Sequence, residues 1–328
     1  MLARTMKQRR FGRLGWQVGD VGCGMWGAVA WSGGDQTEVG AALQQAVDLG
    51  CNFFDTAYAY GAGASEALLG DLVRANPTRK LYTATKIAPK SRRWPSRRED
   101  TVEESYPPDY IEAAVRRSLK HAGLPRFDLI QFHTWEDAWL SDLRWFDRLV
   151  QLRKEGLFEG IGISINRWEP WNGVEAVRSG FIDAVQVIYN VFDQNPIDQL
   201  FPMCEAHDVA VIARVPFDEG ALTGSLTRET RFPSDDWRSG YFGPENLNAS
   251  VARAEALRPL IPAGSDLANL AMRFVLANST VATTIPGMRS RSHVQKNIAC
   301  SDAPPLNEFL LRQLAEHRWD RNPSPWSQ

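Results

Sequence analysis

An alternation of short apolar runs with amphipathic stretches, repeated eight times, most constrains the fold of this chain. Short apolar runs predict buried strands, and apolar residues at helical spacing predict helices. The predicted strands cover residues 18–23, 51–55, 81–85, 128–132, 159–164, 184–188, 209–213 and 281–285. The helices predicted to follow them cover residues 36–49, 66–74, 109–122, 141–155, 169–179, 197–207, 265–278 and 291–299.

Eight strand–helix units without a hydrophilic linker favour a closed barrel over an open doubly wound sheet. The open sheet is further disfavoured because no G-x-G-x-x-G fingerprint follows any predicted strand. Glycines over residues 10–24 predict an N-terminal β-hairpin before the first strand, at the base of the barrel. We therefore expect residues 1–328 to form a single α/β domain, a (β/α)8 TIM barrel. Long loops are expected at the C-terminal face, over residues 90–108, 220–247 and 303–328.

Charge and composition narrow the class of partner. The formal net charge of -2 gives no reason to expect nucleic acid or an anionic membrane. A basic run at residues 90–98 is offset at once by acidic residues between 99 and 104, so a polar rim loop is expected there. The four cysteines have no metal-site spacing, and no segment has the apolar length of a membrane span. A reducing, cytoplasmic setting is expected.

Four polar residues come at the ends of three consecutive predicted strands. Asp55 and Tyr60 follow the second strand, Lys86 ends the third and His133 ends the fourth. In a barrel of this kind the C-terminal strand ends meet at one rim, where active sites lie. A lysine close to a phenol lowers the pKa of the phenol, and a carboxylate holds the ammonium in place. The phenol can then act as a general acid.

In their order and placement these residues resemble the Asp, Tyr, Lys and His tetrad of the aldo-keto reductase superfamily. The resemblance selects Tyr60, rather than Tyr58, as the proton donor. It extends along most of the chain, through the segments DTAYAYG (55–61), GASE (63–66), ATK (84–86), DLIQFH (128–133), IGIS (161–164), QVIYN (186–190), GALTG (220–224) and IPG (285–287).

The resemblance implies an NADPH-dependent reduction of an aldehyde or ketone by direct hydride transfer, reversible to alcohol oxidation. In that scheme Tyr60 protonates the carbonyl oxygen, Lys86 and Asp55 tune Tyr60, and His133 hydrogen-bonds the carbonyl. It requires neither a metal nor a flavin.

The resemblance also implies positions for the nicotinamide. Ser164 and Gln186 match the carboxamide-binding positions of the family. The family usually has Asn directly after the serine, but Ile165 stands there, and Asn166 comes one residue later. Arg214 occupies the place where many members have a tyrosine that stacks on the nicotinamide, and its planar guanidinium can also stack on a ring.

The segment after the last predicted strand indicates a phosphate site. Gly287, Arg289 and Arg291 precede or open the final helix, which also carries Asn297. A helix N-terminus with arginines binds phosphate well. In the family this region binds the adenosine 2′-phosphate, which favours NADP over NAD.

Several alternatives stay open at this stage. Arg289 and Arg291 can equally be solvated surface charges. Two rival functions are a non-catalytic NADP(H)-binding sensor of the same superfamily and a metal-dependent hydrolase, although the five histidines form no HxH pair at a strand end. The physiological carbonyl compound and the oligomeric state do not follow from the residues. Aromatic side chains that either pack or line a substrate site are Trp26, Trp94, Trp135, Trp168, Trp171, Trp237 and Tyr241.

Overall fold

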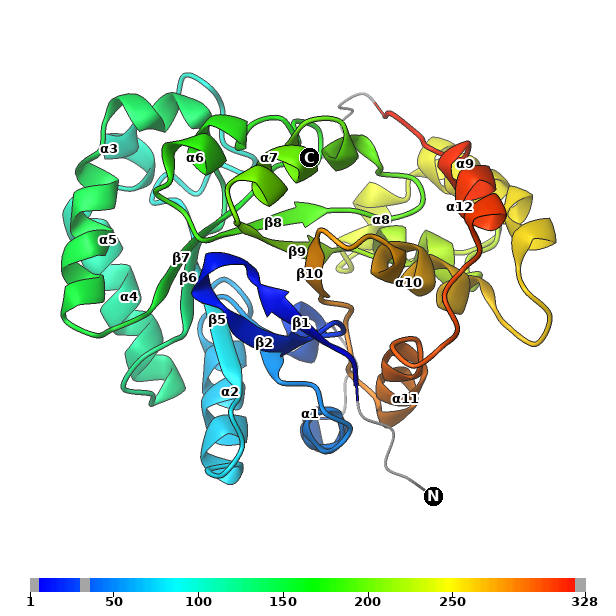
Figure 1. Cartoon of the computed structure of the whole chain (residues 1–328), viewed down its shortest axis with the longest axis horizontal. Helices are drawn as coiled ribbons and strands as arrows, with labels where there is room; N and C mark the ends of the chain where they lie inside the picture. The colour runs from blue at the N-terminus through cyan, green and yellow to red at the C-terminus, as the bar shows by residue number, and fades with distance from the viewer. Residues whose placement is uncertain (1–5, 30–35, 322–328) are drawn as a thin grey trace.

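The computed structural model describes residues 6–29 and 36–321, which include a barrel of eight parallel strands with helices around it (Figure 1). Each strand pairs with the next along the chain, in the order β10-β9-β8-β7-β6-β5-β4-β3. The TIM-barrel expectation is confirmed. The strands are β3 (Cys23–Gly24), β4 (Phe53–Asp55), β5 (Tyr82–Ile87), β6 (Leu129–Phe132), β7 (Gly160–Ser164), β8 (Ala184–Ile188), β9 (Ala210–Arg214) and β10 (Val281–Thr284).

The barrel closes where the first and last strands meet. Two parallel bridges join them, Val21 to Thr284 and Gly24 to Gly287. A Cβ at Gly24 would lie 2.6 Å from the carbonyl oxygen of Ile285, so only glycine lets the two backbones come this close. The closure brings the segment after β10 beside β3.

A helix follows each strand and packs its apolar side against the barrel. The buried faces form one large hydrophobic cluster, to which β-branched and aromatic strand residues also contribute. The helices between successive strands and after β10 are α1 (Gln36–Asp48), α2 (Ala64–Ala75), α4 (Pro108–Ala122), α5 (Arg144–Lys154), α6 (Val174–Ser179), α7 (Leu200–Ala206), α10 (Leu267–Ala277) and α11 (Arg291–Ala299).

The predicted N-terminal hairpin is present and covers the N-terminal end of the barrel. Its antiparallel strands β1 (Gln8–Phe11) and β2 (Trp16–Gly19) lie across that end in Figure 1. Phe11 stacks on Phe53, the first residue of β4, with ring centroids 5.4 Å apart. The hairpin thus seals the end of the barrel opposite the expected active site.

The boundary predicted for the first barrel strand is wrong. Residues 18–23 were expected to form one strand, but Val18 pairs with Arg9 inside the hairpin, and the barrel strand is Cys23–Gly24. The apolar pattern did not separate the hairpin strand from the barrel strand, because Val18 in the first and Cys23 in the second are both buried.

Helices that were not predicted lie in the three long stretches or begin there. They are α3 (Val102–Ser105), α8 (Arg238–Tyr241), α9 (Pro244–Ala256) and α12 (Glu308–Ala315); residues 322–328 of the predicted tail loop lie outside the described part. Helix α9 packs on a separate apolar cluster. There its residues Leu247 and Val251 join Tyr241 and Phe242. Helices α5, α6 and α7 each begin later than predicted, because turns or 3₁₀ segments precede them.

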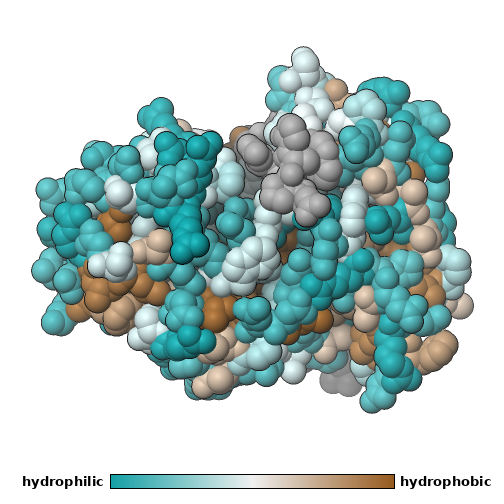
Figure 2. Space-filling model, turned by 90° about the horizontal axis from the view of Figure 1, so that it is seen from above, coloured by the Kyte–Doolittle hydropathy of each residue, from teal (hydrophilic) through white to brown (hydrophobic). Residues whose placement is uncertain are grey.

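Hydrophilic residues dominate the face shown in Figure 2, and the hydrophobic ones there form separate small patches. None of the helices within residues 6–29 and 36–321 combines the length and apolar character needed to cross a bilayer. All four cysteines are buried and free.

Candidate active site

A buried ion pair between Asp55 and Lys86 forms the centre of the site. Asp55 ends β4, Lys86 lies in the neighbouring strand β5, and their side chains are 3% and 0% exposed. Besides donating to Asp55 Oδ2, Lys86 Nζ donates to the carbonyl oxygen of Thr56 at 3.0 Å and to the hydroxyl oxygen of Tyr60 at 3.2 Å. The ammonium therefore uses its three donors, and one of them is directed at the phenol.

Two glutamines fix the other carboxylate oxygen of Asp55. Gln131 on β6 and Gln186 on β8 each donate through Nε2 to Asp55 Oδ1 at 2.9 Å. Burial lowers the pKa of Lys86, but Asp55 and Tyr60 outweigh that effect, so the pKa is raised and the lysine stays charged. The centre thus holds a permanently charged ammonium against Tyr60.

Tyr60 lies on the loop between β4 and α2 and is half-buried. We expected Lys86 to lower the pKa of this phenol. Instead burial raises the pKa of Tyr60, and the opposing effect of Lys86 is smaller. Lys86 therefore acts in the predicted direction, but the loss of solvation on burial outweighs its effect. Tyr60 is consequently a protonated phenol at neutral pH.

His133 stands beside Tyr60 at the end of β6. Its ring meets the Tyr60 ring edge-on at 5.6 Å and the Trp94 ring at 4.4 Å between centroids. Burial, with smaller effects from Lys86 and Arg214, brings the pKa of His133 well below its usual 6.5. The imidazole is therefore neutral, and its buried Nδ1 has no hydrogen-bond partner among the described residues.

A pocket of about 210 Å³ opens beside His133. It brings together three of the predicted cofactor residues, Ser164, Asn166 and Arg214. Gln186 is not part of the wall; its Nε2 bonds Asp55 and Gln131, while its Oε1 accepts no hydrogen bond from the described residues. The other wall residues are Trp94, Pro95, Ser96, Thr134, Trp135, Ile165, Arg167, Ile188, Glu219, Trp237 and Tyr241.

Arg214 ends β9 and reaches across the mouth of the barrel. Its Nη2 donates to the carbonyl oxygen of Ile165 at 3.0 Å, while its buried Nε has no partner in the described part of the chain. Burial lowers the pKa of Arg214, although an arginine remains charged at neutral pH. The guanidinium is held by its bond to Ile165, and Arg214 forms part of the pocket wall.

The predicted phosphate residues lie together around the start of α11. Asn297 is buried, and its Nδ2 is 3.5 Å from the carbonyl oxygen of Gly287. Arg291 is exposed and pairs with Glu38 on α1 at 3.3 Å. Arg289 is also exposed, and it contributes, after Arg238, to the lowered pKa of Asp236. Both arginines are therefore exposed near the start of α11, and Arg291 pairs with a carboxylate.

The sequence did not predict a second group of buried charges, which we call the arginine–aspartate cluster: Arg167, Asp193, Asp218 and Arg321. Arg167 Nη2 lies 3.2 Å from Asp193 Oδ2 and 2.7 Å from Asp218 Oδ1. Arg321 Nη2 lies 2.6 Å and 2.9 Å from the same two oxygens. No side chain of the cluster is more than 10% exposed. The cluster ties the end of the described chain to the pocket wall.

Sequence reasoning also gave no role to Gln131, Arg167 and Glu219. Gln131 could have been found from its alternate position within a strand that ends at His133, which directs it to the barrel interior. Arg167 follows Asn166 directly, and Glu219 lies in the loop after β9, so both occupy C-terminal strand exits. Trp94, Trp237 and Tyr241, which were considered as aromatic walls, do line the pocket.

The residues at the pocket suit a flat, amide-bearing ring such as a nicotinamide. The Arg214 guanidinium and the Asn166 side-chain amide, both in the wall, can donate and accept hydrogen bonds. The side chain of Ser164, next to Gln186 in the β7–β8 register, adds a hydroxyl. The donor set therefore fits the cofactor that the resemblance implies.

Comparison with known proteins identifies the family of the chain. Residues 20–318 match the model of the Aldo/keto reductase family. The uncharacterized oxidoreductase YqkF of Bacillus subtilis is 28% identical, over 95% of this chain and 96% of that protein. The NADH-specific methylglyoxal reductase of Escherichia coli is 24% identical, over 95% and 99%. The holo form of aldo-keto reductase AKR11C1 from Bacillus halodurans has a TM-score of 0.76 at 23% identity, covering 98% of this chain and all (100%) of the other.

Proposed function

The chain belongs to the aldo/keto reductase family and is an NAD(P)-dependent oxidoreductase, and we propose that it reduces an aldehyde or ketone to the alcohol with NADPH, using Tyr60 as the proton donor. The observation that carries this proposal is the position of Lys86 Nζ, 3.2 Å from the Tyr60 hydroxyl and fixed by Asp55. A cytoplasmic location belongs to the same proposal.

The bound nicotinamide supplies the hydride in such a reaction. Tyr60 gives its proton to the oxygen of the substrate carbonyl as negative charge develops there. Because burial raises the pKa of Tyr60, the phenolate that remains would be unstable alone. Lys86 stabilises it electrostatically, since the ammonium is already in place before the reaction begins.

His133 and the two glutamines complete the arrangement. Neutral His133 can donate one hydrogen bond to the carbonyl oxygen and so orient it toward Tyr60. Gln131 and Gln186 keep Asp55 in one position, and Asp55 keeps Lys86 from turning away from the phenol. Read in reverse, the same groups would remove the proton of an alcohol.

Ser164 and Arg214 would hold the nicotinamide carboxamide and ring, with Asn166 beside them in the wall. Gln186, the register partner of Ser164, would contribute from behind the wall. Arg289 would bind the 2′-phosphate that distinguishes NADPH from NADH, with Gly287, Arg291 and Asn297 forming the surrounding helix start. The relative from Escherichia coli is named as NADH-specific, so this preference needs a direct comparison of both cofactors.

The experiment is a fluorescence titration of NADPH with the protein, followed by addition of 4-nitrobenzaldehyde. We expect binding first and then loss of NADPH fluorescence as the cofactor is oxidised, with a weaker response to NADH. Binding without oxidation across aldehydes, ketones and sugars would contradict the reductase proposal and favour a nucleotide sensor.

A further inference from the structure

The indole of Trp94 lies against the imidazole of His133 at the pocket. The two ring centroids are 4.4 Å apart, and the ring planes meet at 79°. Trp94 is 47% exposed and lines the pocket together with His133. The indole therefore contacts the histidine ring on one side and solvent on another.

A buried carboxylate fixes the loop that carries Trp94, which lies between β5 and α3. Asp100 is 4% exposed and pairs with Arg93, the residue before Trp94. Asp100 Oδ2 also accepts a hydrogen bond from the backbone nitrogen of Arg97 at 2.8 Å. Its carbonyl oxygen accepts from Trp139 Nε1 at 2.6 Å. These bonds hold the loop in one shape and tie it to the chain that follows β6.

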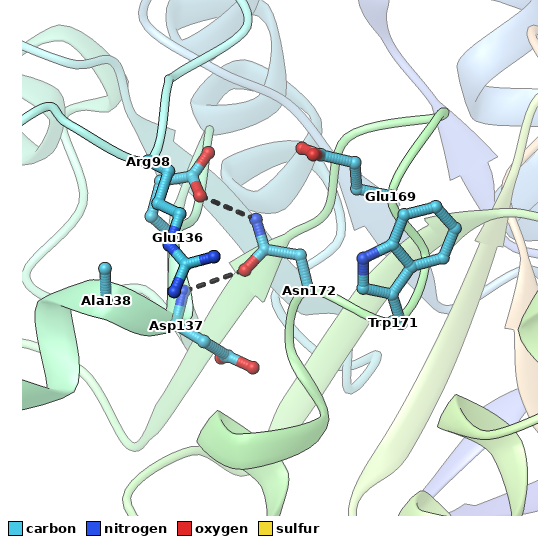
Figure 3. Close-up of a pocket in the computed structure, with 7 residues that line it drawn as sticks. All are labelled: Arg98, Glu136, Asp137, Ala138, Glu169, Trp171 and Asn172. Carbon is cyan, nitrogen blue, oxygen red and sulfur yellow. Dashed lines mark hydrogen bonds between the residues drawn. The ribbon is translucent and has the colours of Figure 1, made fainter. Parts of the chain in front are cut away.

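The same loop is also bonded directly to the residue after His133. The hydroxyl of Ser96 donates to the hydroxyl of Thr134 at 2.5 Å, and both side chains are buried. Two residues further along each segment, Arg98 and Glu136 line one cavity (Figure 3). The loop and the chain after His133 thus run side by side, which keeps the indole in register with the imidazole.

No hydrogen bond from Nδ1 orients the ring of His133. That nitrogen is closed to solvent and has no partner among residues 6–29 and 36–321. The orientation of a histidine ring is commonly set by a hydrogen bond of one nitrogen while the other acts. Because Nδ1 makes no such bond here, packing orients the ring, and the aromatic rings of Trp94 and Tyr60 contact it.

The surroundings of His133 also oppose its protonation. A charged imidazole would carry an N–H at Nδ1, where the described part of the chain offers no acceptor. The charged or titratable groups around the ring are Tyr60 after β4, Lys86 on β5, Arg214 on β9, Glu219 after β9, and the paired Arg93 and Asp100 on the loop of Trp94. Water could solvate the charged ring, and the indole covers the side that it contacts.

We propose that Trp94 is a positioning residue for His133: its indole holds the imidazole in one orientation and keeps water away from it. The catalytic consequence rests on the proposed reductase function, in which neutral His133 orients the carbonyl oxygen. The effect on the imidazole itself does not depend on that function. Without the indole, water would reach the ring and stabilise its charged form.

Carbon-13 NMR of the histidine Cε1 atoms between pH 6 and pH 8, without cofactor or substrate, measures the protonation of His133. Its signal is identified by its absence in His133→Asn. Burial, with Lys86 and Arg214, holds the pKa of His133 well below 6.5, so the wild-type signal should stay at the neutral position. In Trp94→Ala the pKa should rise toward 6.5, and at pH 6 the signal should lie about halfway to the charged position.

Turnover of 4-nitrobenzaldehyde at pH 8, where His133 is largely neutral in every variant, measures the loss of orientation. Trp94→Ala should lower kcat/KM about tenfold, because the carbonyl is less well oriented. Trp94→Phe restores an aromatic cover and should recover most of the activity and the wild-type titration. The control is Trp171→Ala, expected to change neither, since Trp171 is 53% exposed but lines the separate cavity of Figure 3.

A second variant tests the loop without removing the indole. Arg93→Ala breaks the pair with Asp100 and should shift the His133 titration in the same direction as Trp94→Ala, but less. Arg97→Ala is its control, because the Arg97 side chain is 66% exposed and lies 3.9 Å from Glu99. Circular dichroism would show that each variant is folded.

Two results would overturn the proposal: an unchanged His133 titration in folded Trp94→Ala, or an equal shift in Trp94→Ala and Trp171→Ala. Failure of the reductase proposal looks different. In that case the wild-type protein reduces no carbonyl compound, while the NMR titration still shows whether Trp94 shields His133.

Discussion

Two groups of buried charges lie at the mouth of this barrel, and they differ in how their donors are used. In the first, one ammonium, Lys86, serves Asp55, a backbone carbonyl and the phenol of Tyr60. In the second, Arg167 and Arg321 share the same two aspartates, Asp193 and Asp218. Both groups balance their formal charges internally.

The difference shows that buried ion pairs of similar chemistry can either support a reaction or hold a pocket wall in place. The Lys86 group directs one donor at a side chain that can lose a proton. The arginine–aspartate cluster directs its donors mainly at permanent anions, and the Tyr241 hydroxyl receives a bond from Arg167 at 2.5 Å. We expect the first group to govern chemical rate and the second to govern the shape of the pocket wall.

The largest expected effect belongs to Tyr60→Phe, which removes the proposed acid and keeps the ring. Carbonyl reduction should fall by about 10²–10⁴-fold, the usual contribution of a general acid. NADPH binding, measured by fluorescence, should be nearly unchanged. Near-normal turnover in this variant would show that Tyr60 is not the proton donor. It would also contradict the claim that the Lys86 group governs the chemical rate.

Lys86→Met should abolish turnover and also destabilise the fold, because Asp55 would remain buried without a cation. Removal of one partner of a buried pair costs about 3–5 kcal/mol in the free energy of unfolding. Urea unfolding measures this, with Lys80→Met as the control, since Lys80 pairs with Asp128 but is 58% exposed. A loss no larger than that of the control would show that the Asp55–Lys86 pair is energetically unimportant.

Arg321→Met should cost less stability than Lys86→Met, because Arg167 still contacts both aspartates. We expect a loss of about 1.5–3 kcal/mol, the range for a hydrogen bond to a charged group. Arg318→Met, which removes the more exposed pair with Asp198, is the control. The KM of the carbonyl substrate should rise while kcat changes little. A large fall in kcat with unchanged KM would mean that the cluster acts in the chemistry after all.

Cofactor affinity probes a region outside both groups. Arg289→Ala should weaken NADPH by roughly tenfold or more, as expected for the loss of a charge-assisted bond to phosphate. NADH affinity should change much less. Equal losses for NADPH and NADH would show that Arg289 does not contact the 2′-phosphate.

The smallest change is expected in the pH profile of reduction. Because the pKa of Tyr60 is raised, the acid stays protonated through the neutral range, and activity should not fall until above about pH 10. Because the pKa of His133 is well below 6.5, no transition from this group should occur between pH 6 and pH 8. A transition near pH 6.5 that disappears in His133→Asn would contradict a neutral histidine.

The comparison also explains how much could be predicted from the sequence. Asp55, Lys86 and His133 lie at the ends of successive strands, so topology alone brings them together. The arginine–aspartate cluster joins segments up to 154 positions apart (from Arg167 to Arg321), and no local pattern connects Arg321 with Asp193 or Asp218. The sign of the Tyr60 pKa shift depends on burial, which the spacing of residues does not reveal.

The helices and strands, like the site residues, could be predicted where a local pattern marks them and not where it does not. The eight strand–helix units were predictable because their apolar periodicity repeats. Helix α9 was not, because its buried residues, such as Leu247 and Val251, pack on a small separate cluster rather than on the barrel. Val18 was assigned to the first barrel strand because burial in the hairpin and burial in the barrel produce the same apolar pattern.

Transfer of deuterium from NADPH labelled at C4 tests the central claim most directly. The protein would be mixed with the labelled cofactor and 4-nitrobenzaldehyde, and the alcohol product examined by NMR. We predict that one C4 epimer delivers its deuterium to the carbinol carbon in the wild-type protein, and that Tyr60→Phe forms almost no product. Absence of label in the alcohol, or undiminished transfer in Tyr60→Phe, would contradict direct hydride transfer at a site where Tyr60 is the acid.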